Sequence, residues 1–79
     1  MTAIVNIFLK QGVLDPQGKA IHHALDAMNF EGVEDVRMGK QITLKLTATN
    51  KEDAQKEVEK MAEDILANTV IEDYTIEFV

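Results

Sequence analysis

Apolar residues recur along this chain with two different periods, and their order constrains the fold more than any other feature. Residues 3–9 are rich in β-branched and aromatic types, and residues 41–48 and 71–79 alternate between apolar and polar. Both patterns are typical of strands. In residues 21–28 and 54–66, apolar side chains instead return every three or four positions, as they do in amphipathic helices. The chain therefore mixes strands and helices.

Local signals predict where the helices begin and end. Asp15 can accept hydrogen bonds from the free N–H groups at a helix start, and Pro16 suits the first helical position because it has no N–H. A second capping site lies at Thr49-Asn50, ahead of the second apolar stripe. Asn68 is suited to a left-handed residue that ends this second helix.

Residues 33–38 form a further predicted strand, joined to residues 41–48 by a tight turn at Gly39-Lys40. The order is then strand, helix, strand, strand, helix, strand. Right-handed crossovers place both helices on one side of a four-stranded antiparallel sheet. We therefore predict an α+β fold, a ferredoxin-like βαββαβ two-layer sandwich that residues 1–79 form as a single domain.

Composition limits the kinds of site and of partner. With 79 residues the chain is too short for two domains, and with no Cys it has no disulfide, thiolate metal ligand or thiol nucleophile. Acidic residues outnumber basic ones 14 to 8, and the net charge of −6 disfavours nucleic acid as a partner. No long apolar run or charged-then-apolar leader is present, so we expect a cytoplasmic protein that does not enter a membrane.

The first predicted strand is apolar on both faces, although one face of a half-buried strand is usually polar. Val5, Ile7 and Leu9 form one face. Ile4 and Phe8 lie on the other, on the side of the sheet that the helices leave uncovered. A domain this small without disulfides is also a candidate for stabilisation by association. We therefore expect Ile4 and Phe8 to lie at an interface between copies packed through their sheets.

No group of residues in the sequence has the spacing of a catalytic or metal site. His22 and His23 are adjacent and so point about 100° apart on a helix, whereas two metal ligands on one helix need i,i+3 or i,i+4 spacing. Zinc-protease, P-loop and nucleophile-elbow motifs are all missing from the sequence. Tyr74 suits the edge of a core. Read alone, the residues indicate a small acidic interaction module without catalytic residues or a metal.

Three segments together resemble the signature segments of the PurS family, the small subunit of phosphoribosylformylglycinamidine (FGAM) synthase in purine biosynthesis. They are Val13-Leu14-Asp15-Pro16-Gln17-Gly18, Val33-Glu34-Asp35-Val36-Arg37-Met38-Gly39-Lys40 and Leu66-Ala67-Asn68-Thr69-Val70-Ile71-Glu72-Asp73-Tyr74. Each segment alone is weak evidence, but their combined order and spacing are specific. The resemblance spans nearly the whole chain.

The resemblance implies a non-catalytic subunit of a glutamine-hydrolysing ligase. The complete enzyme converts formylglycinamide ribonucleotide (FGAR), glutamine and ATP into FGAM, glutamate, ADP and phosphate. A glutaminase subunit releases ammonia, and a synthetase subunit uses ATP and magnesium. A PurS-like subunit would bind no cofactor itself, form a homodimer or larger oligomer, bridge both partners and assist ammonia transfer.

The resemblance also suggests which residues contact the partner subunits, namely polar or geometrically special positions inside the three segments. These candidates are Asp15, Gln17, Arg37, Gly39, Lys40, Asn68, Thr69 and Asp73. Asp15 has a second reading as a helix cap, and Gly39 as a residue needed for backbone geometry. Two other functions stay open: a stand-alone small-ligand-sensing regulatory domain of the same element order, and a small enzyme that uses the two histidines.

Overall fold

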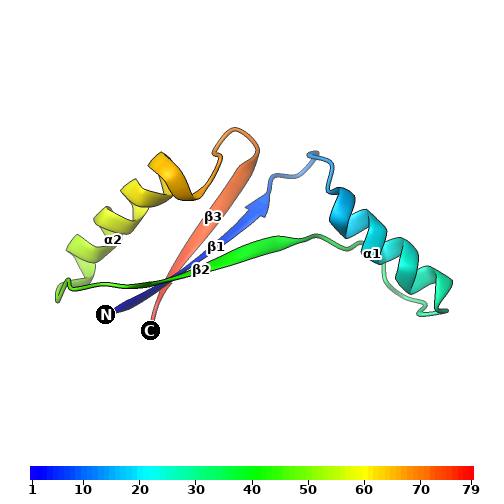
Figure 1. The fold of residues 1–79 in the computed structure, drawn as a ribbon, viewed down its shortest axis with the longest axis horizontal. Helices are drawn as coiled ribbons and strands as arrows, with labels where there is room; N and C mark the ends of the chain where they lie inside the picture. The colour runs from blue at the N-terminus through cyan, green and yellow to red at the C-terminus, as the bar shows by residue number, and fades with distance from the viewer.

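The computed structural model describes residues 1–79 and contains three strands, two α-helices and one π-helical turn. Figure 1 labels the strands and the α-helices. In chain order the elements are β1 (Thr2–Leu9), α1 (Pro16–Ala27), β2 (Gly39–Lys45), α2 (Lys51–Met61), η1 (Ala62–Leu66) and β3 (Glu72–Phe78). The class is therefore α+β, as predicted.

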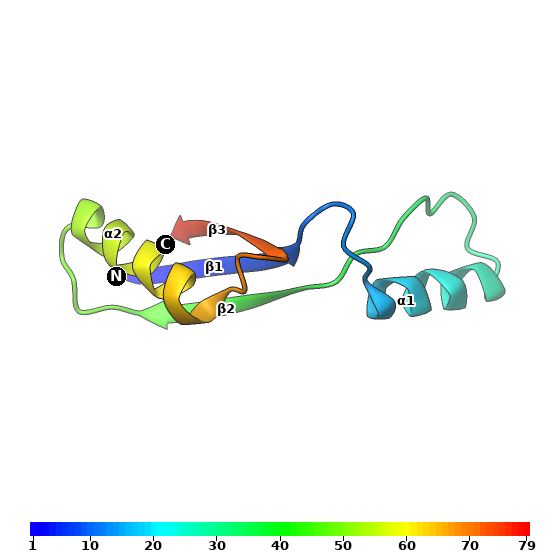
Figure 2. The ribbon, with the colours of Figure 1, turned by 90° about the horizontal axis from the view of Figure 1, so that it is seen from above.

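The strands form one antiparallel sheet in the order β2-β1-β3. Val5 in the central strand faces Ile42 on one side and Ile76 on the other. Helix α2 covers one face of this sheet (Figures 1 and 2). Alternate residues of β1 meet α2 and the chain that follows it in a small core. Its buried members are Ala3, Val5, Ile7, Val58 and Ala67.

Helix α1 lies beyond the end of the sheet and covers neither of its faces (Figure 2). The molecule consequently measures 49 × 25 × 14 Å and has a radius of gyration of 16.0 Å. A compact domain of this length would have a radius of gyration of about 12 Å. The prediction that both helices lie on the sheet is therefore wrong for the single chain.

The sheet of a single chain has three strands, where the sequence predicted four. Residues 33–38 pair with no strand and continue in the same direction into β2 (Figure 1), so the predicted turn at Gly39-Lys40 is not formed. Gly39 and Lys40 are instead extended and pair with Phe8 and Ile7 of β1. Pairing with the end of β1 keeps this segment straight.

The predicted helix starts are confirmed, but the predicted end at Asn68 is wrong. Asp15 caps α1 by accepting a hydrogen bond from Gly18, and Asn50 caps α2 by accepting one from Glu52. Asn68 does not have a positive φ angle. Helix α2 ends instead through η1, whose closing hydrogen bond runs from the Ala67 N–H five residues back along the chain.

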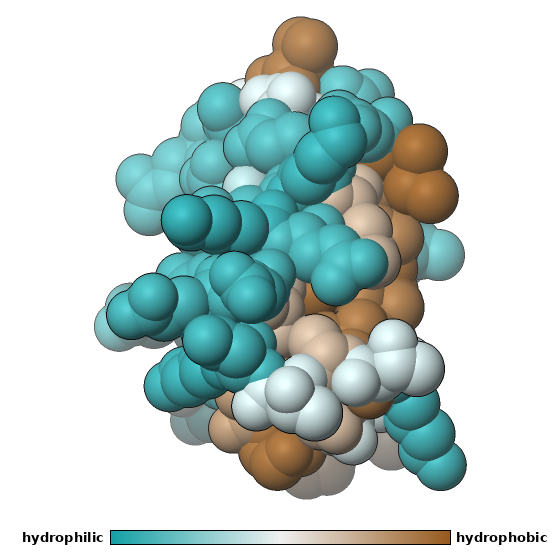
Figure 3. All heavy atoms as spheres, turned by 90° about the vertical axis from the view of Figure 1, so that its left-hand side faces the viewer, coloured by the Kyte–Doolittle hydropathy of each residue, from teal (hydrophilic) through white to brown (hydrophobic).

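Hydrophilic side chains gather on one side of the end of the molecule that carries α2, with apolar side chains on the other side (Figure 3). Residues 51–79 contain nine acids and three bases, so they carry the whole net charge of −6.

Neither α-helix has the length and apolar run needed to cross a membrane.

Candidate interaction site at the neck

Two chain segments connect the sheet to α1: residues 10–15 leave it after β1, and residues 35–40 return to it. We call this junction the neck. Parts of all three segments that resemble the PurS family meet here. Residues 15–17 open α1, residues 36–40 run back beside them, and residues 72–73 begin β3 next to the end of β1.

Asp15 holds the two segments of the neck together. Its carboxylate accepts one hydrogen bond from the Gly18 N–H (2.9 Å) and another from the Met38 N–H (2.7 Å), and the residue is only 4% exposed. These bonds, with that from Met38 the stronger influence, hold the pKa of Asp15 below its ordinary value of 3.8. Asp15 is therefore both a helix cap and a link to the returning segment.

Gly18 and His22 extend this contact along α1. A Cβ atom on Gly18 would lie 2.3 Å from the Val36 carbonyl oxygen, so only glycine permits so close an approach. One turn further, the His22 Nε2 lies 2.8 Å from the Val33 carbonyl oxygen and donates its hydrogen to it. His22 thus packs α1 against residues 33–38. It belongs to no group of three or more side chains placed to hold a metal ion.

Charged side chains join the neck to β3. Arg37 Nη2 donates to the Lys10 carbonyl oxygen (3.2 Å), and Lys10 Nζ lies 3.8 Å from Asp73 Oδ1. Lys40 Nζ lies 3.9 Å from Glu72 Oε2. Both ion pairs are partly exposed, so each contributes less than about 1 kcal/mol to stability. The ion pairs therefore hold the charged groups in place but contribute little to the stability of the fold.

Two hollows open at the neck and share Phe8 and Leu9. The first has a volume of about 220 Å³, and its lining residues are Ile7, Phe8, Leu9, Asp15, Gln17, Met38, Gly39, Lys40 and Glu72. The second has a volume of about 470 Å³, and its lining residues are Phe8, Leu9, Gln11, Gly12, Asp35, Arg37 and Asp73. Six of the eight predicted partner contacts line one or other hollow.

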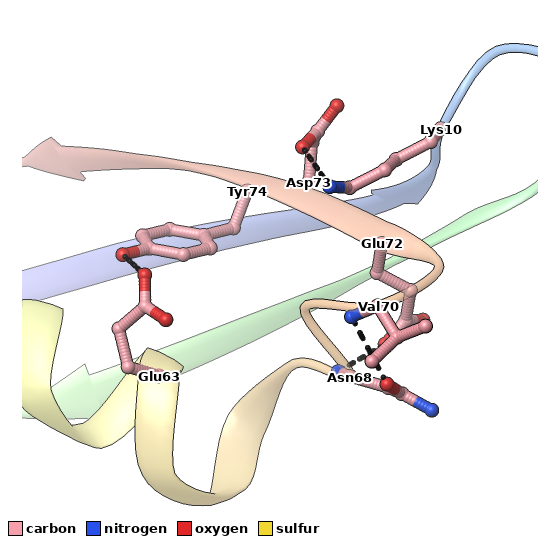
Figure 4. A network of polar contacts seen from close by, with 7 residues as sticks. All are labelled: Lys10, Glu63, Asn68, Val70, Glu72, Asp73 and Tyr74. Carbon is pink, nitrogen blue, oxygen red and sulfur yellow. Dashed lines mark hydrogen bonds and ion pairs between the residues drawn. The ribbon is translucent and has the colours of Figure 1, made fainter.

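The other two predicted contacts, Asn68 and Thr69, lie in the turn between η1 and β3. Figure 4 shows Asn68 in this turn. The Asn68 side chain accepts from the Val70 N–H (3.2 Å), and the Asn68 N–H donates to Glu72 Oε1 (2.7 Å). Thr69 is half-buried in the same turn. Because Glu72 also pairs with Lys40, this turn is linked to the first hollow. The role of all eight residues in partner binding stays a prediction.

Tyr74, in β3, holds this strand against η1. Its hydroxyl donates to Glu63 Oε1 at 2.9 Å (Figure 4). This hydrogen bond, with partial burial and the nearby charges of Glu63 and Glu59, raises the pKa of Tyr74 above 10.0. A tyrosine that stays protonated to high pH acts here as a hydrogen-bond donor that fixes η1 on β3.

Reasoning from the sequence missed two residues of this site. Glu72 lies inside the third matching segment but is not among the predicted partner contacts. His22 is considered in the sequence only as a metal ligand or an enzyme residue, whereas in the structure its ring binds the Val33 carbonyl oxygen of the returning segment. The position of Glu72 inside a matching segment was a usable signal. The contact of His22 depends on how the chain folds back, so no signal in the sequence could have predicted it.

Ile4 and Phe8 lie on the face of the sheet opposite α2, because their neighbours in β1 point into the core. Phe8 is 41% exposed. Between them, Asn6 accepts from Gln41 Nε2 (2.9 Å) and donates to Thr75 Oγ1 (3.5 Å). The open face thus carries a row of polar side chains between two apolar ones. Its role as an interface between copies stays a prediction.

Known proteins match this chain over nearly its whole length. A family model described as PurS, phosphoribosylformylglycinamidine (FGAM) synthase, matches residues 2–79. The phosphoribosylformylglycinamidine synthase subunit PurS of Bacillus subtilis is 48% identical over 73 residues, covering 92% of this chain and 86% of that protein.

Solved structures of PurS proteins also match this chain over nearly its whole length. Methanocaldococcus jannaschii PurS has a TM-score of 0.86 at 42% identity and covers 96% of this chain and 92% of its own. A chain in the structure of PurLQS from Thermotoga maritima has a TM-score of 0.90 at 32% identity, covering 99% and 95%. The alternative of a stand-alone regulatory domain finds no support in these matches. The chain belongs to the PurS family of FGAM synthase subunits.

Proposed function

We propose that this chain, acting as one PurS-like domain over residues 1–79, bridges the glutaminase and synthetase subunits of FGAM synthase. The observation that carries this proposal is the convergence of the three matching segments at the neck. There, charged side chains held by hydrogen bonds and ion pairs surround two open hollows. Such a surface suits specific contacts with other proteins, because its polar groups are already positioned before binding.

The proposed chemical role is to assist ammonia transfer. The reaction needs neutral ammonia, and bulk water would protonate it. An interface that excludes water between the glutaminase and the synthetase would keep ammonia reactive. ATP and magnesium would bind to the synthetase subunit, and no cofactor to this chain. The relative with a TM-score of 0.90 comes from a structure of PurLQS, which supports a role within an assembly.

We also propose that the chain acts as a homodimer in the cytoplasm, and that the four-stranded ferredoxin-like layer forms only between two copies. Two features of the single chain support this. Its sheet lacks the fourth strand of that layer, and α1 lies on no sheet. A second copy can supply both missing parts.

The direct test of bridging is a binding experiment with purified glutaminase and synthetase subunits. We expect the two to co-elute as one complex with this chain present and to elute separately without it. A matched control replaces Lys56, on the outer face of α2, with alanine and should bind normally. Co-elution that is equally complete without this chain would contradict the bridging role.

A further inference from the structure

The connection between η1 and β3 exposes two large apolar side chains, which we call the apolar pair. Ile65, in η1, is 81% exposed, and Val70, in the turn that follows, is 82% exposed. No other large apolar side chain in the chain is as exposed as these two. Isolated apolar residues are common on protein surfaces, but large ones that expose most of their area close together in one connection mark a candidate contact surface.

The π-helical turn is the reason that Ile65 points away from the core. Ile65 follows Val58 by seven residues and Ala62 by three, so a regular α-helix would place all three on one face. Val58 and Ala62 are fully buried on that face. In η1, however, the Ala67 N–H donates to the Ala62 carbonyl oxygen five residues back, which widens the turn and shifts Ile65 out of line. The irregular turn therefore exposes a side chain that the apolar pattern would bury.

Hydrogen bonds hold the turn between η1 and β3 in place before any partner binds. The Asn68 side chain accepts from the Val70 N–H at 3.2 Å (Figure 4). The Asn68 carbonyl oxygen accepts from the N–H groups of Ile71 (3.0 Å) and Glu72 (2.7 Å), and the Lys10 N–H donates to the Ile71 carbonyl oxygen (2.9 Å). A turn fixed in this way loses little conformational freedom on binding, so burial of its apolar side chains contributes more fully to affinity.

Acidic residues flank the apolar pair, and residues 61–74 contain no Lys, Arg or His. The four acids are Glu63, Asp64, Glu72 and Asp73. Three of them pair with lysines of other segments at nitrogen–oxygen distances from 3.6 to 3.9 Å, and these pairs are partly exposed. Such pairs are weak, so the carboxylates can still bind a second cation. The surface therefore fits a protein partner that is apolar at the centre of the contact and basic at its edge.

A second copy of this chain does not have that chemistry. Around a twofold axis at this turn the same surface would meet itself, and the four acids of one copy would face the four acids of the other. Like charges brought together in an interface are unfavourable. Charge therefore favours a different protein as the occupant.

The turn is continuous with the neck, where we place contacts with the partner subunits. Glu72 Oε1 accepts from the Asn68 N–H (2.7 Å), and Glu72 Oε2 lies 3.9 Å from Lys40 Nζ at the first hollow. The two residues of the apolar pair are five positions apart, at most about 17 Å of chain. One protein interface of ordinary size, about 800 Å² on each partner, can therefore reach both of them and the hollow.

We propose that Ile65 and Val70 are the apolar anchors of the contact with one of the two partner subunits. They insert into an apolar recess of that subunit, and Lys or Arg side chains at the edge of the recess face the four acids. A bridging chain needs separate surfaces for its two partners, because one surface holds only one of them. The proposal rests on the bridging role and adds two apolar residues to its eight polar or glycine candidates.

Affinity for each partner tests the apolar anchors. The unmodified chain and the variants Ile65→Ser and Val70→Ser are titrated with the purified glutaminase, with the synthetase and with the two mixed. We expect both variants to bind the same one of the two subunits at least about tenfold more weakly, as truncation of a central anchor does. Affinity for the other subunit should stay within about twofold of the unmodified chain. Val79→Ser is the matched control, because Val79 is 77% exposed beyond the far end of β3. It should bind both subunits normally.

Charge reversal tests the basic edge of the partner. Asp64→Lys should weaken binding to the same subunit as the two serine variants, and added salt should slow the association of the unmodified chain with that subunit. Glu57→Lys makes the same change of charge at an exposed position of α2 and should have a smaller effect. Asp64→Lys that binds as tightly as the unmodified chain would contradict a basic edge.

The titrations distinguish failure of the anchors from failure of the bridging role. Unchanged affinity of both serine variants for both subunits would overturn the anchors and leave the bridging role intact. A smaller oligomer of either folded variant by light scattering would assign the pair to a contact between copies and overturn the proposal. An unmodified chain that binds neither subunit nor their mixture would overturn the bridging role itself. Circular dichroism should show all variants folded, because the substituted side chains are exposed.

Discussion

Asp15 shows how one residue can perform two structural tasks that sequence patterns separate. Its capping role was predictable, because a capping residue before a proline marks a helix start. Its second bond, to the Met38 N–H, joins residues 23 positions apart and could not be predicted from local signals. That bond links the start of α1 to the segment that returns to the sheet.

The two roles of Asp15 can be separated by substitution. Asn in place of Asp15 keeps an oxygen for the Gly18 N–H but turns its amide toward the Met38 N–H, whereas Ala loses both bonds. We expect Asp15→Ala to lower the free energy of unfolding more than Asp15→Asn, measured by urea denaturation. In hydrogen exchange, both variants should lose protection at Met38. Equal destabilisation by the two variants would contradict a separate role for the second bond.

Asp15 also predicts how stability depends on pH. Its pKa is lowered in the folded state, so its contribution is present above pH 3.8 and is lost as pH falls through the lowered folded pKa. The difference in unfolding free energy between the unmodified chain and Asp15→Asn should therefore be constant from pH 5 to 7 and shrink below about pH 4. A difference in unfolding free energy that grows toward low pH would contradict a lowered pKa of Asp15 in the folded state.

At the scale of elements, the sequence predicted the helices and the strands of the sheet but not the path between them. A straight segment and a hairpin at residues 33–48 have the same alternating pattern, so the pattern cannot tell them apart. The pairing of Gly39 with Phe8 selects the straight segment over the hairpin, and these two residues are far apart in the sequence. The six candidate residues at the neck lie inside segments that resemble a known family, so the resemblance could point to them. The contact of His22 with the Val33 carbonyl oxygen depends on how the chain folds back, and no local pattern predicts it.

The close approach of α1 to the returning segment gives a prediction for Gly18. Alanine would place its Cβ 2.3 Å from the Val36 carbonyl oxygen, and the helix would have to move away. We expect Gly18→Ala to cost about 1–3 kcal/mol by urea denaturation, as overpacking usually does. Lys19→Ala, at an exposed neighbouring position, should change stability by less than about 0.5 kcal/mol. A neutral Gly18→Ala would show that α1 is not held this closely.

At the scale of the whole molecule, the single chain is elongated, its helix α1 covers no sheet, and its neck is polar. These features are typical of a protein that is incomplete alone. Membership of the PurS family gives that incompleteness a function, because FGAM synthase in this family is built from separate subunits. Ammonia transfer, the role we propose, then depends on contacts at the neck and not on a catalytic group in this chain.

Arg37 tests whether the neck serves ammonia transfer. Its side chain binds only the Lys10 carbonyl oxygen in the single chain and lines the larger hollow. In the reconstituted enzyme we expect Arg37→Ala to lower glutamine-dependent FGAM formation several-fold and ammonia-dependent formation much less. Circular dichroism and light scattering should be unchanged, and Lys56→Ala should retain both activities. Equal loss of the two activities in Arg37→Ala would argue against a role in transfer.

The most direct test of the account omits the chain from the enzyme. FGAM formation is measured with purified glutaminase and synthetase subunits, with and without this chain, using either glutamine or ammonium chloride as nitrogen source. We predict that glutamine-dependent formation requires the chain, whereas ammonia-dependent formation persists without it. Glutamine-dependent formation at an undiminished rate in its absence would contradict the claim that this chain joins the two active subunits.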